Sequence, residues 1–209
     1  MTLDELLPML DAESIKMGDI KKIAQKIKTD HELAQKLWST KKFHPRLLAV
    51  LIMDKKCLDQ NYINQLVQDM KSHDTKQSNQ ISEWLLANQL TKSKKTIQLL
   101  ESWKESSEPI LQRLFWYYQA RLRWTGKIHD DTPQLMEYLE NNMENADPVV
   151  QWGMNLCAGW IGVFDTKYRS RCIALGKKLG LYKGEAVSKG CTPSYLPEFI
   201  KIEVAKRKK

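Results

Sequence analysis

The sequence predicts an all-α protein, an α-solenoid in which short helices stack in pairs. Apolar residues recur at three- and four-residue spacing along nearly the whole chain, as in Ile63, Leu66, Val67 and Met70, and this is the period of one helix face. No run alternates apolar and polar residues for long enough to predict a strand. Turn signals divide the chain into helices of about 10–16 residues, so that two helices span roughly 30–40 residues, the period of helix-pair repeats.

Proline and other turn residues set the boundaries of the predicted helices in chain order. Breaks are predicted at Phe43–Pro45, Asp59–Asn61, Ser72–Asp74, Glu108–Pro109, Thr125–Lys127, Asp131–Pro133, Asp147–Pro148 and Gly190–Pro193. Pro109, Pro133 and Pro148 each follow an acidic or hydroxyl residue, as prolines do near the first position of a helix. Because successive helix pairs resemble one another only weakly, an irregular helical bundle remains the alternative.

Length and composition predict one domain over residues 1–209, with 42% hydrophobic and 28% charged residues. No apolar run is long enough for a membrane span, and the acidic start of the chain lacks the features of a signal peptide, so we expect a cytoplasmic monomer. The four cysteines are scattered without a Cys-x-x-Cys pair, so we expect buried, reduced thiols and no metal site. No histidine has a catalytic spacing, and no cofactor is indicated.

Positive charge is concentrated near the carboxyl end of the sequence. The formal net charge is +8, and from Gln151 onward there are 12 Lys and Arg residues against 4 Asp and Glu. The densest part is the basic end at about 200–209, which closes with Lys206, Arg207, Lys208 and Lys209. Such a run is typical of a solvated chain end and equally of a protein that is steered toward phosphates.

Trp84 and Asn88 form the first candidate site, because residues four apart share one helix face. A flat apolar ring beside a polar group suits a nucleobase or a sugar. The structural alternative is a half-buried tryptophan between repeats. Five other tryptophans have apolar neighbours and are expected in the core: Trp38, Trp116, Trp124, Trp152 and Trp160.

Arginines and lysines form the second set of candidates. Arg46 and Arg113 lie within apolar helical segments, where a guanidinium needs a carboxylate, a group of carbonyls or a phosphate as its partner. Three further cationic groups are candidates for DNA binding if they converge on one face, and otherwise form solvated surface: Lys92, Lys94 and Lys95; Arg121 and Arg123; Arg169 and Arg171.

At these residues the chain resembles the HEAT-like alkylpurine DNA glycosylases of the DNA alkylation repair family, the AlkD type. Trp84-Leu85-Leu86-Ala87-Asn88 is similar to the family's Trp-Asp-x-x-Asp motif, and Arg113 matches an arginine near the start of an apolar helix. Further similarity lies in four segments along the chain: His31–Trp38 with Arg46–Ala49, Trp103–Ser106, Ala174–Gly180 and Gly190–Pro193.

The resemblance implies a HEAT-like curved superhelix whose concave face binds duplex DNA, including alkylated duplex. It also implies that Trp84, the residue at 88 and Arg113 line a site from which cationic alkylated purines are released. This chain has Asn88 where the family has an Asp, and Leu156 where a later aromatic is expected. An amide carries no charge to stabilise an oxocarbenium-like sugar. Three functions therefore stay open: a glycosylase, a non-catalytic binder of DNA structures, and a protein-interaction scaffold.

Overall fold

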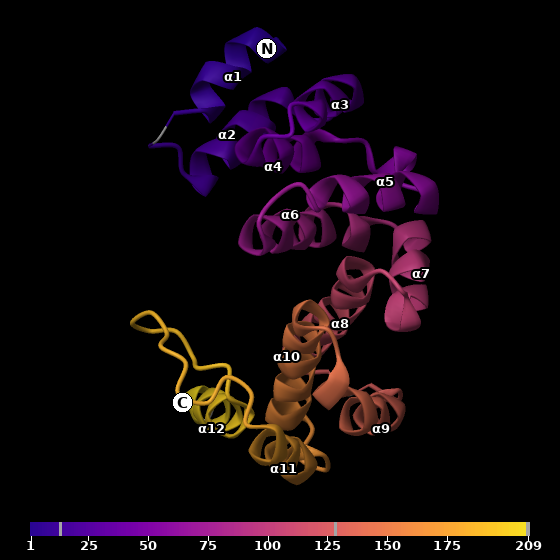
Figure 1. The fold of residues 1–209 in the computed structure, drawn as a ribbon, viewed down its shortest axis with the longest axis vertical. Coiled ribbons are helices and arrows are strands. Elements are labelled where there is room, and N and C mark those ends of the chain that lie inside the picture. The colour runs from indigo at the N-terminus through magenta and orange to yellow at the C-terminus, as the bar shows by residue number, and fades with distance from the viewer. Residues whose placement is uncertain (13, 128, 208–209) are drawn as a thin grey trace. The chain divides into compact units, whose positions relative to one another are not determined.

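The computed structural model describes residues 1–12, 14–127 and 129–207. Within these residues every regular element is a helix and no strand occurs, which confirms the predicted all-α class. The α-helices in the described chain are α1 (Leu3–Leu10), α2 (Met17–Ile27), α3 (His31–Ser39), α4 (Phe43–Ile52), α5 (Gln60–Met70), α6 (Thr75–Asn88), α7 (Lys94–Ser102), α8 (Pro109–Trp124), α9 (Thr132–Asn142), α10 (Pro148–Phe164), α11 (Arg169–Leu179) and α12 (Leu196–Lys206) (Figure 1). Short 3₁₀ helices are η1 (Lys55–Cys57), η2 (Leu90–Lys92), η3 (Trp103–Glu105) and η4 (Met143–Asn145).

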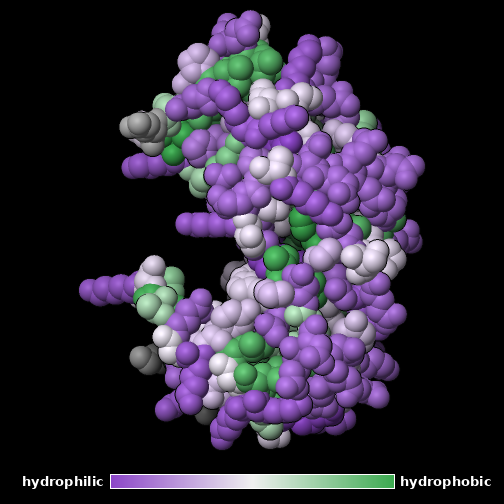
Figure 2. All heavy atoms as spheres, in the orientation of Figure 1, coloured by the Kyte–Doolittle hydropathy of each residue, from purple (hydrophilic) through white to green (hydrophobic). Residues whose placement is uncertain are grey.

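The helices form two compact units, each with its own core. The first unit, Met1–Ser102, contains α1 to α7, and the second, Trp103–Lys209, contains α8 to α12. None of the described helices is both long enough and apolar enough to cross a membrane. Most side chains on the face drawn in Figure 2 are hydrophilic, as expected when the apolar stripe of each helix is buried within its unit.

The first unit is built around α4, whose residues from Pro45 to Val50 are all buried. This helix packs against α2, α3 and α6, and α5 packs against α6. Aspartates begin several of these helices: Asp30, Asp59 and Asp74 accept hydrogen bonds from the first-turn amides of α3, α5 and α6. These caps therefore fix where α3, α5 and α6 begin.

The second unit is centred on α10, which packs along α8 and also contacts α11 and α12. Small residues make this close packing possible. A Cβ added to Gly153 would lie 3.0 Å from the Cβ of Trp116 on α8, and one added to Gly162 would lie 2.5 Å from Ile200 on α12. α10 is therefore covered by helices on several sides, which explains why it has so few charged residues.

The predicted boundaries agree with the structure at most turns. Pro109, Pro133 and Pro148 lie in the first turns of α8, α9 and α10, as expected. The break predicted at Phe43–Pro45 is wrong, because these residues form the first turn of α4 and the chain reverses at Lys41, where φ is 60°. Proline is tolerated in a first helical turn, since its missing N–H has no partner there.

Two expectations about buried residues need correction. Trp38, Trp116 and Trp160 are buried and Trp152 is half-buried, whereas Trp124, the last residue of α8, stacks on Trp160 and is 53% exposed. Among the cysteines, Cys157 and Cys172 are buried thiols, whereas Cys57 and Cys191 are exposed. Burial raises the pKa of the Cys157 thiol to about 12.

Candidate nucleic-acid interface

Trp84 and Asn88 lie one turn apart near the end of α6, as the sequence predicts. The buried stripe of this helix runs through Ile81, Leu85 and Leu86, which leaves Trp84 and Asn88 on its partly exposed side. The Nδ2 atom of Asn88 donates a hydrogen bond to the backbone oxygen of Trp84 over 2.9 Å. The amide group is thus held against its own helix, with its orientation set by the preceding turn.

Asn88 forms part of the wall of an open groove in the first unit. The groove has a volume of about 470 Å³ and lies among α2, the residues that follow α2, α4 and α6. Its lining residues in the described chain are Lys21, Ala24, Gln25, Lys28, Thr29, Leu51 and Asn88. These described lining residues include two lysines and no carboxylate, so the groove has a positive electrostatic potential.

Lys21 connects the groove to the tryptophan. Its side chain lines the groove, and its Nζ atom lies 5.4 Å from the centre of the Trp84 ring, within the range of a cation–π contact. A hydrogen-bond contact of 3.4 Å between Gln80 Nε2 and Met17 Sδ also links α6 to α2. The Trp84 ring therefore already has a cation from the same protein on its face.

Lys28 holds an unusual backbone conformation at the edge of the groove. Lys28 follows α2 with φ of 65° and ψ of −130°, and its N–H donates to the backbone oxygen of Ala24 over 2.8 Å. This region of backbone space strains any residue with a Cβ, and such strain is often found at functional positions.

The sequence analysis missed Lys21 and Lys28, although a signal for them exists. Lys21, Gln25 and Lys28 are spaced by four and three residues, so they follow one side of α2. A polar stripe of this kind is also typical of a solvated helix face. Only the packing of α2 and α6 against the same helix, α4, brings this stripe to Asn88.

Arg113 is buried in the second unit, with 3% of its surface exposed. Its Nη1 atom donates to the backbone oxygen of Val149 over 3.0 Å, and its guanidinium lies 4.1 Å from the centre of the Trp152 ring. A backbone carbonyl, one of the structural partners that the sequence analysis considered, is thus among the partners of Arg113. Trp84 and Asn88 belong to the first unit, whereas Arg113 belongs to the second.

Arg46 and Arg123, predicted as DNA ligands, are buried and hold helices together. Arg46 is 1% exposed and donates from Nη1 to the Asp69 backbone oxygen (2.6 Å) and to Ser72 Oγ (3.0 Å). Arg123 is 2% exposed, and its Nη2 atom lies 2.5 Å from Asp131 Oδ1. A phosphate cannot reach a guanidinium that is sealed by these partners, so neither arginine enters the interface proposed below.

Arg169 and Arg171 have protein partners as well. Arg169 donates to the backbone oxygens of Gly162 and Val163, both over 2.8 Å, near the end of α10. Arg171 forms a two-bond pair with the Glu140 carboxylate over 2.9 and 2.6 Å. This pair raises the pKa of Arg171 and lowers that of Glu140, in both cases chiefly through the hydrogen bond.

The remaining cationic candidates are more accessible. Lys92, Lys94 and Lys95 are exposed in η2 and the first turn of α7, while Arg121 is half-buried with its guanidinium 6.0 Å from the centre of the Tyr117 ring. Their role in DNA binding stays a prediction.

At the basic carboxyl end, Lys206 and Arg207 are ion-paired with Glu203. Lys208 and Lys209 lie outside the described residues.

Comparisons with known proteins identify the family and the fold of the chain. A family model described as the DNA alkylation repair enzyme matches residues 12–159, which is more than half of the chain. The chain belongs to the DNA alkylation repair enzyme family. Trp84, Asn88 and every described residue of the groove lie inside the span that matches this family. A comparison of the sequence with curated proteins gave no match.

A solved structure has the same fold over almost the whole chain. It is described as "a new family of proteins related to the HEAT-like repeat DNA glycosylases with affinity for branched DNA structures". The TM-score is 0.70 at 16% sequence identity, and the alignment covers 98% of this chain and 88% of the other. The predicted HEAT-like solenoid class is thereby confirmed, since a likeness at this identity shows the fold.

Proposed function

We propose that this chain binds DNA through its backbone phosphates and acts without releasing bases. The observation that supports this function most directly is the groove beside Asn88, with Lys21 and Lys28 in its wall and no carboxylate among its described residues. Phosphate contacts from lysine supply most of the sequence-independent affinity of DNA-binding proteins, because each contact releases condensed counterions. In a chain of the DNA alkylation repair family, a polyanionic ligand is the one that fits this groove.

We propose further that branched DNA binds more tightly than linear duplex. The solved structure with the same fold is described among proteins with affinity for branched DNA structures, which supports this preference. Phosphate contacts position a protein on the DNA backbone and carry no sequence information by themselves. A surface that relies on them responds to the way in which strands are arranged, and a branch brings backbones from several arms together.

Alkylpurine DNA glycosylase activity is the second candidate function. Trp84 is half-buried rather than sealed, and Asn88 faces an open groove, so a modified nucleotide has access to this side of α6. The missing element is charge, because the family's carboxylate is replaced here by an amide. Preorganised charge is commonly worth on the order of 10²–10³ in rate. We therefore expect weak or no release of methylated purines from duplex DNA by the wild-type chain.

The test is a pair of measurements on the same protein preparation. Binding to a four-way junction and to a linear duplex of equal length is titrated at several salt concentrations. We expect tighter binding to the junction and a log–log slope of about −0.9 for each phosphate contact. Release of methylated purines is assayed in parallel. Strong release would contradict the non-catalytic proposal, and no binding at low salt would favour the scaffold alternative.

A matched pair of variants connects this binding to the groove. Lys21→Gln/Lys28→Gln removes two charges that line the groove, and we expect a shallower salt slope and weaker binding to both DNAs. Lys22→Gln/Lys76→Gln removes two charges from exposed lysines of α2 and α6 that do not line it. Equal losses in the two double variants would show that the groove is not the phosphate site.

A further inference from the structure

Lys21 lies over a feature beside the groove, the Trp84 ring, that would otherwise attract a cation. The face of an indole ring carries partial negative charge and binds positively charged groups. In this chain the Lys21 ammonium already lies 5.4 Å from the centre of the Trp84 ring. The groove reaches Lys21 and Asn88, and Trp84 is not among its described lining residues. A ligand that enters the groove therefore meets the ammonium before it meets the ring.

We propose that Lys21 is a specificity-determining residue that makes this site select anions and reject cationic bases. The inference rests on the proposed function, since it names the group of the DNA that the groove accepts: a backbone phosphate. A purine nucleotide alkylated at N3 or N7 carries a positive charge, because that ring nitrogen gains a bond without losing a proton. Such a base would have to displace Lys21 from Trp84 and would then lie beside two ammonium groups. Like charges at short range repel, and the described wall of the groove contains no carboxylate to offset them.

Asn88 contributes to the same selection through its hydrogen bond. Its Nδ2 atom donates to the Trp84 backbone oxygen over 2.9 Å. A carboxylate at this position would face that oxygen as a second acceptor and would have to rotate away from it. The groove into which it would turn is lined by Lys21 and Lys28. Those ammonium groups would neutralise the new charge, so changing Asn88 alone does not create a site for a cation.

The experiment compares two linear duplexes that differ only in one cationic base, 7-methylguanine or guanine at the same position. The measured quantity is the ratio of the two dissociation constants for the wild-type chain, for Lys21→Ser and for Lys22→Ser. Lys22 is the control because it is the next residue of α2, is exposed, and pairs with Asp19 outside the groove. Serine at either position removes one positive charge and keeps a polar side chain.

We expect the wild-type chain and Lys22→Ser to bind the methylated duplex no more tightly than the unmethylated one. Lys21→Ser should shift the ratio toward the methylated duplex by about tenfold, the size of a cation–π contact expressed as an equilibrium constant. Asn88→Asp alone should leave the ratio unchanged, and Asn88→Asp/Lys21→Ser should shift it further than Lys21→Ser.

Two results would overturn the inference while DNA binding itself persists. One is a wild-type chain that already prefers the methylated duplex. The other is a Lys21→Ser variant that binds both duplexes with an unchanged ratio. Failure of the wild-type chain to bind either duplex or a junction would overturn the proposed function, and the inference with it. Circular dichroism of each variant confirms that the helices are retained, since Lys21 is exposed and its removal leaves the core intact.

Discussion

At the scale of single residues, the two kinds of basic side chain have different roles in this protein. Arg46, Arg113 and Arg123 are buried and donate to backbone carbonyls or pair with a carboxylate. A guanidinium has five donors in a planar fork and is less strongly hydrated than an ammonium, so it is the better group to bury. Lys21 and Lys28 remain exposed around the groove, as expected of strongly hydrated point charges.

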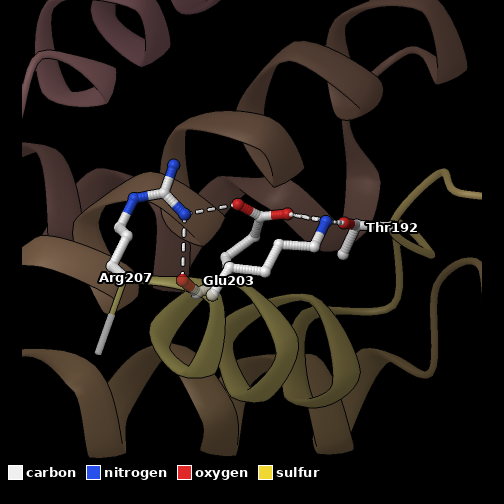
Figure 3. Close-up of polar contacts among 4 residues, drawn as sticks. Thr192, Glu203 and Arg207 are labelled. Atoms are coloured by element: carbon white, nitrogen blue, oxygen red, sulfur yellow. Dashed lines mark hydrogen bonds and ion pairs between the residues drawn. The ribbon is translucent and has the colours of Figure 1, made fainter. Parts of the chain in front are cut away.

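The hydrogen bonds of Glu203 show how a charged carboxylate stabilises the folded chain. Its carboxylate accepts hydrogen bonds from Thr192 Oγ1, Lys206 Nζ and Arg207 Nη1 (Figure 3). Burial alone would raise the pKa of Glu203, but these hydrogen bonds outweigh it and lower the pKa to about 2. The cluster joins α12 to Thr192 in the segment that precedes it. Two of the cations at the basic end are thus held by the protein itself.

We predict that Glu203→Gln destabilises the protein by about 2 kcal/mol at pH 7. Because the pKa is lower in the folded chain than in the unfolded one, the stabilisation by the carboxylate is complete above about pH 4.5. It is lost as the pH falls toward 2. Urea unfolding of both proteins between pH 7 and pH 3 should show the difference shrinking. Glu198→Gln, an exposed position on the same helix, is the control; an equal cost there would contradict this account.

At the scale of elements, close approach between helices holds the second unit together. A Cβ added to Gly176 on α11 would lie 2.5 Å from the Cβ of Leu196 and 2.8 Å from Cδ of Pro197, both on α12. Neither atom belongs to the flexible end of a long side chain, so the helices themselves would have to move apart. Close-packed interiors transmit such a displacement to their neighbours. Glycine is therefore needed at 176 for the contact between α11 and α12.

We predict that Gly176→Ala destabilises the protein by about 2 kcal/mol, because overpacking exceeds the gain in helix propensity. Gly18→Ala is the matched control, since Gly18 also lies in a helix and a Cβ there would meet nothing within 4 Å. It should gain up to about 1 kcal/mol, mainly because alanine restricts the unfolded chain. The midpoints of urea unfolding measure the stability of both variants relative to the wild-type chain. Equal stability of the two variants would mean that α11 and α12 separate easily.

At the scale of the whole molecule, part of the excess positive charge counted in the sequence is paired with carboxylates of the same chain. Near the carboxyl end, Arg171, Lys178, Lys206 and Arg207 are each ion-paired with a glutamate. The skew in charge that suggested a phosphate-directed end is thus partly offset by these ion pairs. The cationic groove lies instead in the first unit, where the sequence is closer to electrical balance.

The prediction of a single domain over residues 1–209 has a direct test in thermal unfolding. Five of the seven tryptophans lie in Trp103–Lys209, so fluorescence reports mainly on the second unit, whereas far-ultraviolet circular dichroism reports on helices of both. One cooperative domain requires that the two signals change with the same midpoint. We expect coincident transitions. A separate transition that is seen by circular dichroism and not by fluorescence would show that the two units unfold independently.

The sequence by itself determined the helical class, most helix starts and the place of Trp84 and Asn88 on one helix face. These are local properties, because apolar spacing, proline and capping residues act within one or two turns. The position of Asn88 was predictable for the same reason, since residues four apart meet on any helix.

Only the tertiary structure determined which cationic side chains are exposed and which residues surround Asn88. Lys21 is more than sixty residues away in sequence, and only the packing of α2 and α6 against α4 brings its ammonium over Trp84. In the same way, the carbonyls of Val149 and Asp69 that hold Arg113 and Arg46 come from other helices. Burial and partners of a long charged side chain depend on its neighbours in space, and the spacing of residues along one helix does not specify them.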